Sequence, residues 1–175
     1  MQPYRALAIC AAAVYVTARF WLGGDARPLN LPEGRYRVAE VTGGDTIVLA
    51  NQVRIRLLGI APSHGSGRKS GSGAPPPDEA LASAAADFIR RSVLQGEVQL
   101  QFDRTRIDAD GQMLGYVWFD DGERGRLLLN EELLREGLAR AEPRAPCSSS
   151  MKRRLTKVAD EARREHRGLW ANESP

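Results

Sequence analysis

The sequence predicts an α+β fold that is mainly β, with a separate apolar segment at its N-terminus. Three observations lead to this prediction. Apolar and polar residues alternate in several short runs through the middle of the chain, as they do in half-buried strands. Three other segments carry apolar residues at helical spacing. The 175 residues leave room for one ordinary domain and an appendage, because domains cluster near about 100–150 residues.

Six segments have the alternation and the β-branched residues that are typical of strands. They cover residues 36–42, 46–50, 53–60, 98–103, 113–119 and 126–129. Gly43-Gly44 and Asn51-Gln52 separate the first three segments, and we expect a hairpin turn at each place.

Three helices are predicted around these strands. Pro77-Asp78 opens the first, which ends at Gly96, and Asn130 is expected to cap a short second helix that Gly137 closes. The third covers residues 151–166, and its buried face consists of Leu155, Val158, Ala159 and Ala162. This order of strands and helices predicts a five-stranded OB-type β-barrel packed with about three α-helices.

Composition excludes several classes of protein. With 42% hydrophobic and 27% charged residues, the chain is neither wholly disordered nor a multi-span membrane protein. The formal net charge of +3 is too small to argue for a polyanionic partner by itself. Cys10 and Cys147 lie in unlike contexts and form no disulfide framework, and the scarcity of histidine speaks against a structural zinc site.

Residues 1–22 have the pattern of a signal peptide or a membrane anchor. A positively charged start precedes the apolar run 6–16, and Val16-Thr17-Ala18 offers small residues to a signal peptidase. The run is shorter than the roughly 20 residues that span a bilayer, so we favour cleavage after Ala18. The alternatives are an uncleaved anchor extended by Phe20-Trp21-Leu22 and a buried N-terminal helix. We therefore expect an extracytoplasmic protein, either secreted or anchored to a membrane through its N-terminus.

The remaining segments divide by composition. Residues 23–35 contain Gly and Pro and are expected to link the N-terminal segment to a domain over 36–170, which a short tail, 171–175, follows. Within the domain, the run 62–77 is rich in Gly, Ser and Pro. We expect a flexible loop there, because such a run cannot bury enough apolar area to order itself.

Five blocks of sequence in this domain occur in a characteristic order. They are Gly43-Gly44-Asp45-Thr46-Ile47-Val48, Arg56-Leu57-Leu58-Gly59-Ile60, Asp108-Ala109-Asp110-Gly111-Gln112-Met113-Leu114, Asn130-Glu131-Glu132-Leu133-Leu134-Arg135-Glu136-Gly137-Leu138-Ala139 and Arg167-Gly168-Leu169-Trp170. Together they resemble the staphylococcal nuclease (thermonuclease) family. The resemblance implies hydrolysis of DNA and RNA phosphodiesters with calcium. It also implies a site with two metal-binding aspartates, a glutamate that activates water, two phosphate-binding arginines and tyrosines that contact the substrate. Calcium prefers oxygen ligands, and guanidinium groups match phosphate oxygens.

Transferred position by position, the resemblance implies an incomplete catalytic set. Asp45 stands where the family places one metal ligand, and Arg56 matches the first phosphate arginine. The chain reads Ala61-Pro62-Ser63-His64 where the family has its second metal aspartate and its general-base glutamate. Gln112 replaces the second arginine, and residues 142–145 replace the substrate tyrosines.

Three residues offer substitutes for the missing carboxylates. His64 aligns with the glutamate and could act as a base near neutral pH. Asp78 or Glu79 could bring a carboxylate across the loop. The ordinary alternatives are a solvated loop histidine and a helix N-terminus stabilised by these acids. Asp45 has the alternative role of stabilising its turn, and Arg56 that of an ordinary arginine on the barrel surface.

The sequence supports two main functional hypotheses. The first is a catalytically impaired, exported or membrane-tethered module that binds a nucleic acid, DNA or RNA, or a protein. A protein partner is slightly favoured, because the aromatic residues that would stack on bases fall on core positions. The second hypothesis is an active metal-dependent nuclease with a rearranged site, and calcium is expected as a cofactor only in that case. A structural subunit without a ligand is a third alternative.

The strip from residue 152 to residue 167 carries an excess of basic residues. It holds seven basic and three acidic residues. Lys152, Arg153 and Lys157 could contact phosphates nonspecifically, although a solvated helix face is the more common outcome of such a pattern.

Overall fold

A computed structural model of the chain describes residues 31–62 and 77–171. The predicted N-terminal signal or anchor, most of the predicted linker and His64 lie outside these residues. No helix within the two described ranges is long and apolar enough to cross a membrane.

The described residues form eight strands, three α-helices and one 3-10 helix. They are β1 (Gly34–Val41), β2 (Thr46–Leu49), β3 (Arg54–Leu57), β4 (Ile60–Pro62), α2 (Pro77–Val93), β5 (Glu97–Gln101), β6 (Met113–Asp120), β7 (Arg126–Leu128), α3 (Leu129–Arg135), β8 (Ala139–Ala141), α4 (Ser149–Arg164) and the 3-10 helix η1 (Gly168–Trp170).

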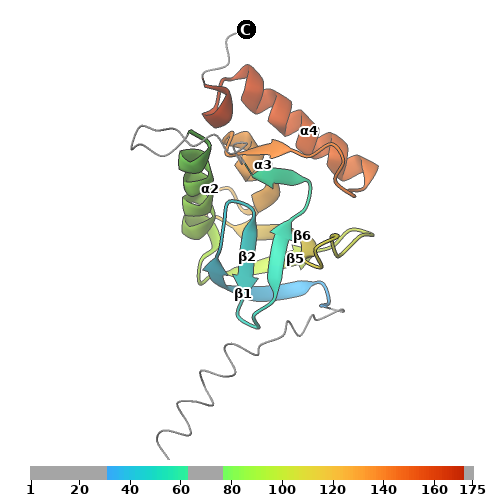
Figure 1. Ribbon diagram of the computed structural model, residues 1–175. Coiled ribbons are helices and arrows are strands. Elements are labelled where there is room, and N and C mark those ends of the chain that lie inside the picture. The colour runs from blue at the N-terminus through green and yellow to red at the C-terminus, as the bar shows by residue number, and fades with distance from the viewer. Residues whose placement is uncertain (1–30, 63–76, 172–175) are drawn as a thin grey trace, which may run out of the picture. The chain divides into compact units, whose positions relative to one another are not determined.

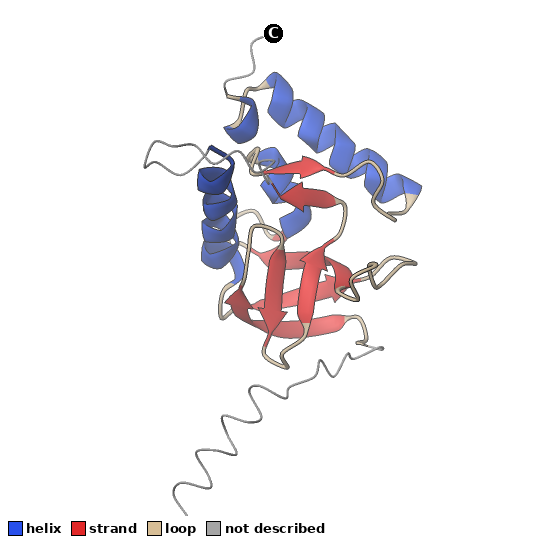
Figure 2. Ribbon diagram, in the orientation of Figure 1, coloured by secondary structure: helices blue, strands red, loops and turns tan. Residues whose placement is uncertain are grey.

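Five strands of the described residues close into a barrel. The strands follow the order β3-β2-β1-β5-β6 with antiparallel neighbours, and a parallel pairing of β3 with β6 completes the ring. β7 extends the sheet beyond β6, and β4 and β8 form a separate two-stranded sheet above the barrel (Figure 2). With α2, α3 and α4 around it, this arrangement confirms the predicted mainly β, OB-type fold (Figure 1).

The strands form because their alternation places one face in a shared core. In β5, Val98 and Leu100 are buried while the residues on either side of each are more exposed. β6 is buried along most of its length, because it pairs with β5 on one side and with β3 on the other. The barrel interior is correspondingly apolar, with Ile47, Leu49, Ile55, Leu57 and Leu100 almost completely buried.

The predicted single strand over 53–60 is wrong, since the structure divides it into β3 and β4. Gly59 lies between them with φ +87°, a conformation that side chains other than glycine rarely adopt. A Cβ at this position would lie 2.5 Å from Leu155 Cδ1 and 3.0 Å from Cys147 Sγ. The glycine turn therefore directs β4 away from the barrel, where Ile60 pairs with Ala141 of β8.

The predicted capping role of Asn130 is also wrong. β7 leads directly into α3, whose N-cap position is Leu128, so Asn130 lies inside the helix. Its fully buried side-chain amide donates to the carbonyls of Leu58 at 2.9 Å and Gly115 at 3.3 Å, and its oxygen accepts from Val117 N at 3.1 Å. Asn130 therefore joins α3 to both β6 and the end of β3.

α4 packs on α3 through the apolar face that the sequence predicts, and it begins two residues earlier than expected. Leu155, Val158, Ala159 and Ala162 are its buried residues. A polar connection adds to this packing, because Glu131 of α3 accepts hydrogen bonds from Arg154 at 2.6 Å and from Arg135 at 2.7 Å. These contacts fix which side of α4 faces outward.

Candidate active site

Asp45 and Arg56, the two retained residues of the predicted site, form an ion pair at one end of the barrel. Asp45 immediately precedes β2, and the β2–β3 register places Thr46 opposite Arg56. Arg56 Nε donates to Asp45 Oδ2 at 3.1 Å, and Thr46 Oγ1 donates to Asp45 Oδ1 at 2.9 Å. Both oxygens of the Asp45 carboxylate are therefore bonded within the domain.

Asp108 is a second acidic partner of Arg56. Its Oδ2 lies 3.5 Å from Arg56 Nη1, and its Oδ1 accepts from the backbone N–H groups of Asp110 at 3.0 Å and Gln112 at 2.8 Å. The parallel pairing of β3 with β6 brings this turn beside Arg56, because Arg56 pairs with Leu114. Partial burial opposes ionisation of Arg56, but the carboxylates of Asp45 and Asp108 outweigh it and raise the pKa of the guanidinium.

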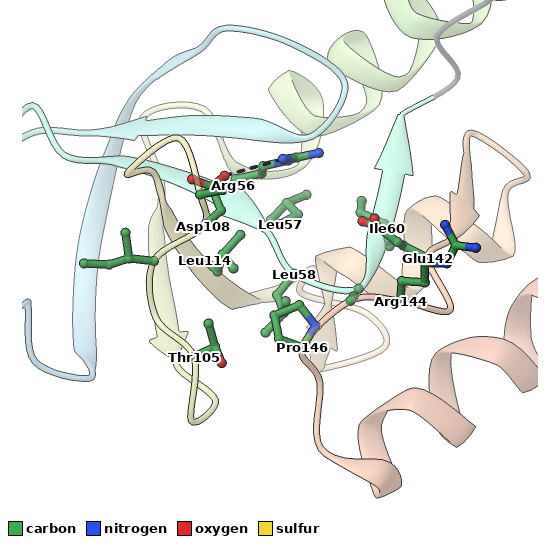
Figure 3. A pocket seen from close by; sticks show the side chains of 14 residues that line it. Arg56, Leu57, Leu58, Ile60, Thr105, Asp108, Leu114, Glu142, Arg144 and Pro146 are labelled. Carbon is green, nitrogen blue, oxygen red and sulfur yellow. Dashed lines mark hydrogen bonds and ion pairs between the residues drawn. The ribbon is translucent and has the colours of Figure 1, made fainter.

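A cavity of about 280 Å³ opens next to this ion-paired cluster. Arg56, Asp108 and Thr105 lie on one side of it, and Glu142, Arg144 and Pro146 lie on the other (Figure 3). Its remaining lining is mostly apolar and includes Leu57, Leu58, Ile60, Ile107 and Leu114. The cavity thus has a hydrophobic floor with charged groups on both sides.

The charges around the cavity compensate one another. Arg56 and Arg144 contribute two positive charges to the lining, and Asp108 and Glu142 contribute two negative charges, so the sum is zero. Asp45, bonded to Arg56 from outside the lining, makes the balance −1. A cavity that attracts phosphate would need an excess of positive charge, which this one lacks.

The described residues of this site do not fit a bound calcium ion. Calcium takes six to eight oxygen ligands, with several carboxylates where the affinity is high. Asp45 has both oxygens engaged, and the described residues contain no group of three or more His, Cys, Asp or Glu side chains that could hold a metal.

Sequence reasoning assigned no role to Asp108, Glu142 or Arg144. Asp108 stood in one of the family blocks, but its contact with Arg56 depends on the β3–β6 pairing, which only the fold reveals. Glu142 and Arg144 reach the cavity because β8 pairs with β4, and Glu142 N donates to Gly59 O at 3.0 Å. The Glu142 carboxylate makes no hydrogen bond or ion pair with another described residue.

The other predicted site residues do not join this cluster. Asp78 lies at the start of α2 and its side chain is not described, whereas Glu79 is exposed in the same turn. Lys152, Arg153 and Lys157 line a separate depression on α4. Of the predicted set, the described structure brings together Asp45 and Arg56 alone.

Comparison with known proteins agrees with the fold. A family model described as staphylococcal nuclease homologue matches residues 54–172. A thermonuclease of Staphylococcus hyicus is 28% identical over 146 residues, which cover 82% of this chain and 79% of that protein. A thermonuclease of Staphylococcus intermedius is 26% identical over 169 residues, covering 93% of this chain and 94% of that protein. Because the family model spans more than half of the chain, from β3 through η1, the chain belongs to the staphylococcal nuclease family.

Proposed function

We propose that this chain is a nuclease-family domain with impaired hydrolysis that acts as an exported binding module. The observation that carries the proposal is the arrangement around Arg56, whose guanidinium lies between Asp45 at 3.1 Å and Asp108 at 3.5 Å. An arginine that stabilises a phosphoryl transition state must direct its N–H groups at the phosphate. Here two of them are directed at carboxylates that belong to the domain.

The catalytic groups that this chain lacks also favour impaired hydrolysis. A general base contributes about 10²–10⁴ in rate, and an arginine on a transferring phosphoryl group roughly 10³–10⁵. The chain has His64 and Gln112 where the family resemblance implies the general-base glutamate and the second arginine, and Ala61 where it implies a metal aspartate. These contributions are not additive, but the loss of either would be severe.

Residues 1–22 support the exported part of the proposal. Their positive start, apolar run and small residues before position 19 are typical of a signal peptide, and an uncleaved segment would tether the domain to a membrane. The domain would then present its binding surfaces outside the cytoplasm.

One observation favours the alternative, an active nuclease with a rearranged site. Glu142 places a carboxylate on the cavity that Arg56 also lines, and its side chain has no bonding partner among the described residues. A carboxylate in that position could accept the proton of an attacking water. His64 would be a second candidate for this role, with calcium as the cofactor of the active form.

Cleavage assays distinguish the two functions. The full chain, purified in mild detergent, is incubated with single-stranded DNA, double-stranded DNA and RNA in calcium or in EDTA. Its matched variants are Asp45→Ala/Arg56→Ala, which removes the retained pair, and Arg54→Ala, which removes an exposed arginine of the same strand. We expect no calcium-dependent cleavage above that of the double variant.

Calcium-dependent cleavage that the double variant loses and the Arg54 variant keeps would overturn the proposal. Glu142→Gln and His64→Gln would then identify the base, with an expected loss of about 10²–10⁴ in rate for whichever residue acts.

A further inference from the structure

α4 carries a group of cations that, unlike Arg56, do not lie between two carboxylates. Of the seven basic residues between positions 152 and 167, three are engaged inside the domain. Arg154 binds Glu131 at 2.6 Å, Arg163 stacks on the Trp170 ring at 5.3 Å, and Arg167 pairs with Glu165 at 2.6 Å. The other four are Lys152, Arg153, Lys157 and Arg164, which we call the outer face of α4. Among the described residues, their side-chain hydrogen bonds and ion pairs stay within α4, since Arg164 Nε donates to Asp160 O at 3.2 Å and Lys157 approaches Glu161 at 3.9 Å.

The outer face points away from the core because α4 buries its opposite side. Leu155, Val158, Ala159 and Ala162 pack inward, and Glu131 holds Arg154 on α3. Arg153, Lys157 and Arg164 are exposed, and α4 runs along the outside of the domain (Figure 1). The four cations line one shallow depression of about 320 Å³ together with Thr156 and Asp160.

Local acids reduce the charge of this face without cancelling it. Asp160 lies in the depression, and Glu161 approaches Lys157 at 3.9 Å, a long contact for an ion pair. Lys157 keeps 77% of its side chain exposed, so that contact is weak. Four cations and two acids leave a local charge of +2, whereas the cavity and Asp45 together carry −1.

The spacing of the cations fits an extended polyanion. Arg153, Lys157 and Arg164 follow one side of the helix, since they are four and seven residues apart. At 1.5 Å per residue they span about 16 Å. A duplex carries one phosphate per about 3.4 Å of its axis on each strand, so a row of this length can reach several phosphates of the backbone.

The residue types on α4 favour a duplex over a single-stranded nucleic acid as the partner. Binding of single strands relies on aromatic side chains that stack on bases. The α4 sequence, SSMKRRLTKVADEARR, contains no aromatic residue, and its exposed side chains are charged or small and polar. Such a face can contact the phosphate backbone but does not recognise individual bases.

We infer that the outer face of α4 is a sequence-independent docking surface for the phosphate backbone of a nucleic-acid duplex, separate from the cavity at Arg56. The inference deepens the proposed binding function by naming its partner. It does not depend on loss of hydrolysis, because binding is measured in EDTA and cleavage is measured separately. Nonspecific binding of this kind has dissociation constants of about 10⁻⁴–10⁻⁶ M at physiological salt.

Salt-dependent binding of the full chain in mild detergent to a 20-base-pair DNA of random sequence tests the inference. With four contacting cations, the slope of log K against log salt concentration is expected to be about −3 to −4. The variant Lys152→Gln/Arg153→Gln/Lys157→Gln/Arg164→Gln is expected to lose at least about tenfold in affinity at 50 mM salt, with a slope near zero.

The matched control removes the same charge elsewhere. Arg37, Arg54, Arg91 and Arg104 are exposed and make no ion pair with a described residue, so replacing all four by Gln changes the net charge equally. This control is expected to keep most of the native affinity and slope, and unfolding curves verify that both variants remain folded.

Three results would overturn the inference. One is absence of duplex binding by the native chain, and another is an equal loss in both quadruple variants. The third is binding to anionic phosphatidylserine vesicles that depends on the four α4 residues while duplex binding is missing, which would assign the face to a membrane surface.

Discussion

The cavity beside Arg56 and the outer face of α4 both contain cations, but the surroundings of these cations are opposite. Arg56 lies within 3.5 Å of two carboxylates, whereas Lys152 and Arg153 make no ion pair with any described residue. The difference arises from the fold, since β3–β6 pairing brings Asp108 to Arg56 and α4 packing turns its basic side outward. A retained motif arginine is therefore a weak guide to function until the carboxylates around it are known.

The largest expected effect concerns Asn130, which bonds to Leu58 in the wall of the cavity. Asn130→Ala would leave the carbonyls of Leu58 and Gly115 and the N–H of Val117 without their side-chain partner in a buried place. We expect a loss of about 3 kcal/mol in the free energy of unfolding, measured by urea denaturation. Glu136→Ala, an exposed change at the end of the same helix, serves as the control and should cost less than about 0.5 kcal/mol. Equal effects of the two substitutions would show that the cavity wall does not depend on these bonds.

Removal of Arg56 separates a structural cation from a catalytic one. Arg56→Ala would leave Asp45 and Asp108 without their shared partner, and the partial exposure of the guanidinium limits the cost to about 1–2 kcal/mol. Arg54→Ala, on the exposed side of β3, should change stability by less than about 0.5 kcal/mol. A stabilised Arg56 variant would instead indicate a site strained for function, contrary to the proposed role.

A smaller effect concerns Asp103, which bonds to the residue that precedes α4 and stabilises the protein in a pH-dependent way. Asp103 accepts hydrogen bonds from Ser148 N at 2.7 Å, Arg104 N at 2.8 Å and Tyr116 Oη at 3.0 Å. Burial opposes ionisation, but these hydrogen bonds outweigh it and lower the pKa of Asp103 below 3.8. The stabilisation is therefore complete above pH 3.8 and is lost as the pH falls through the folded-state pKa.

Asp103→Asn is expected to lower stability at pH 7 by about 1 kcal/mol and to remove part of this acid-dependent loss. Thermal unfolding between pH 7 and pH 2 measures both, with the exposed Asp87→Asn as control. Parallel pH curves for the native chain and the Asp103 variant would contradict this role.

The fold was largely predictable from the sequence, and the site was predictable only in part. The alternation of apolar and polar residues predicts the barrel strands, and apolar residues at helical spacing predict α2 and α4. Both patterns are visible in the sequence because burial of one face of an element leaves a local periodicity. The sequence predicts Gly59 within a strand, because neither its φ of +87° nor the close approach of Leu155 from α4 is visible in the local pattern. Asn130 was read as a cap, because its buried bonds to Leu58 and Gly115 are tertiary.

Asp45 and Arg56 were found through the family blocks, and the structure places them in contact. Asp108, Glu142 and Arg144 were assigned no role, since their convergence on one cavity depends on two strand pairings between distant segments. The expectation that the aromatic residues of the domain lie in its core is met by Phe102, Tyr116 and Trp170, which are buried, whereas Phe88 and Trp118 are half-buried.

Duplex binding by two matched double variants tests the contrast between cavity and helix most directly. Arg56→Gln/Arg144→Gln removes both cations of the cavity, and Arg153→Gln/Lys157→Gln removes two cations of the outer face, so the net charge changes equally. In EDTA, we expect the cavity variant to retain the native salt slope. The α4 variant is expected to lose about two units of slope and about tenfold in affinity at 50 mM salt. Loss of binding in the cavity variant with native binding in the α4 variant would contradict it.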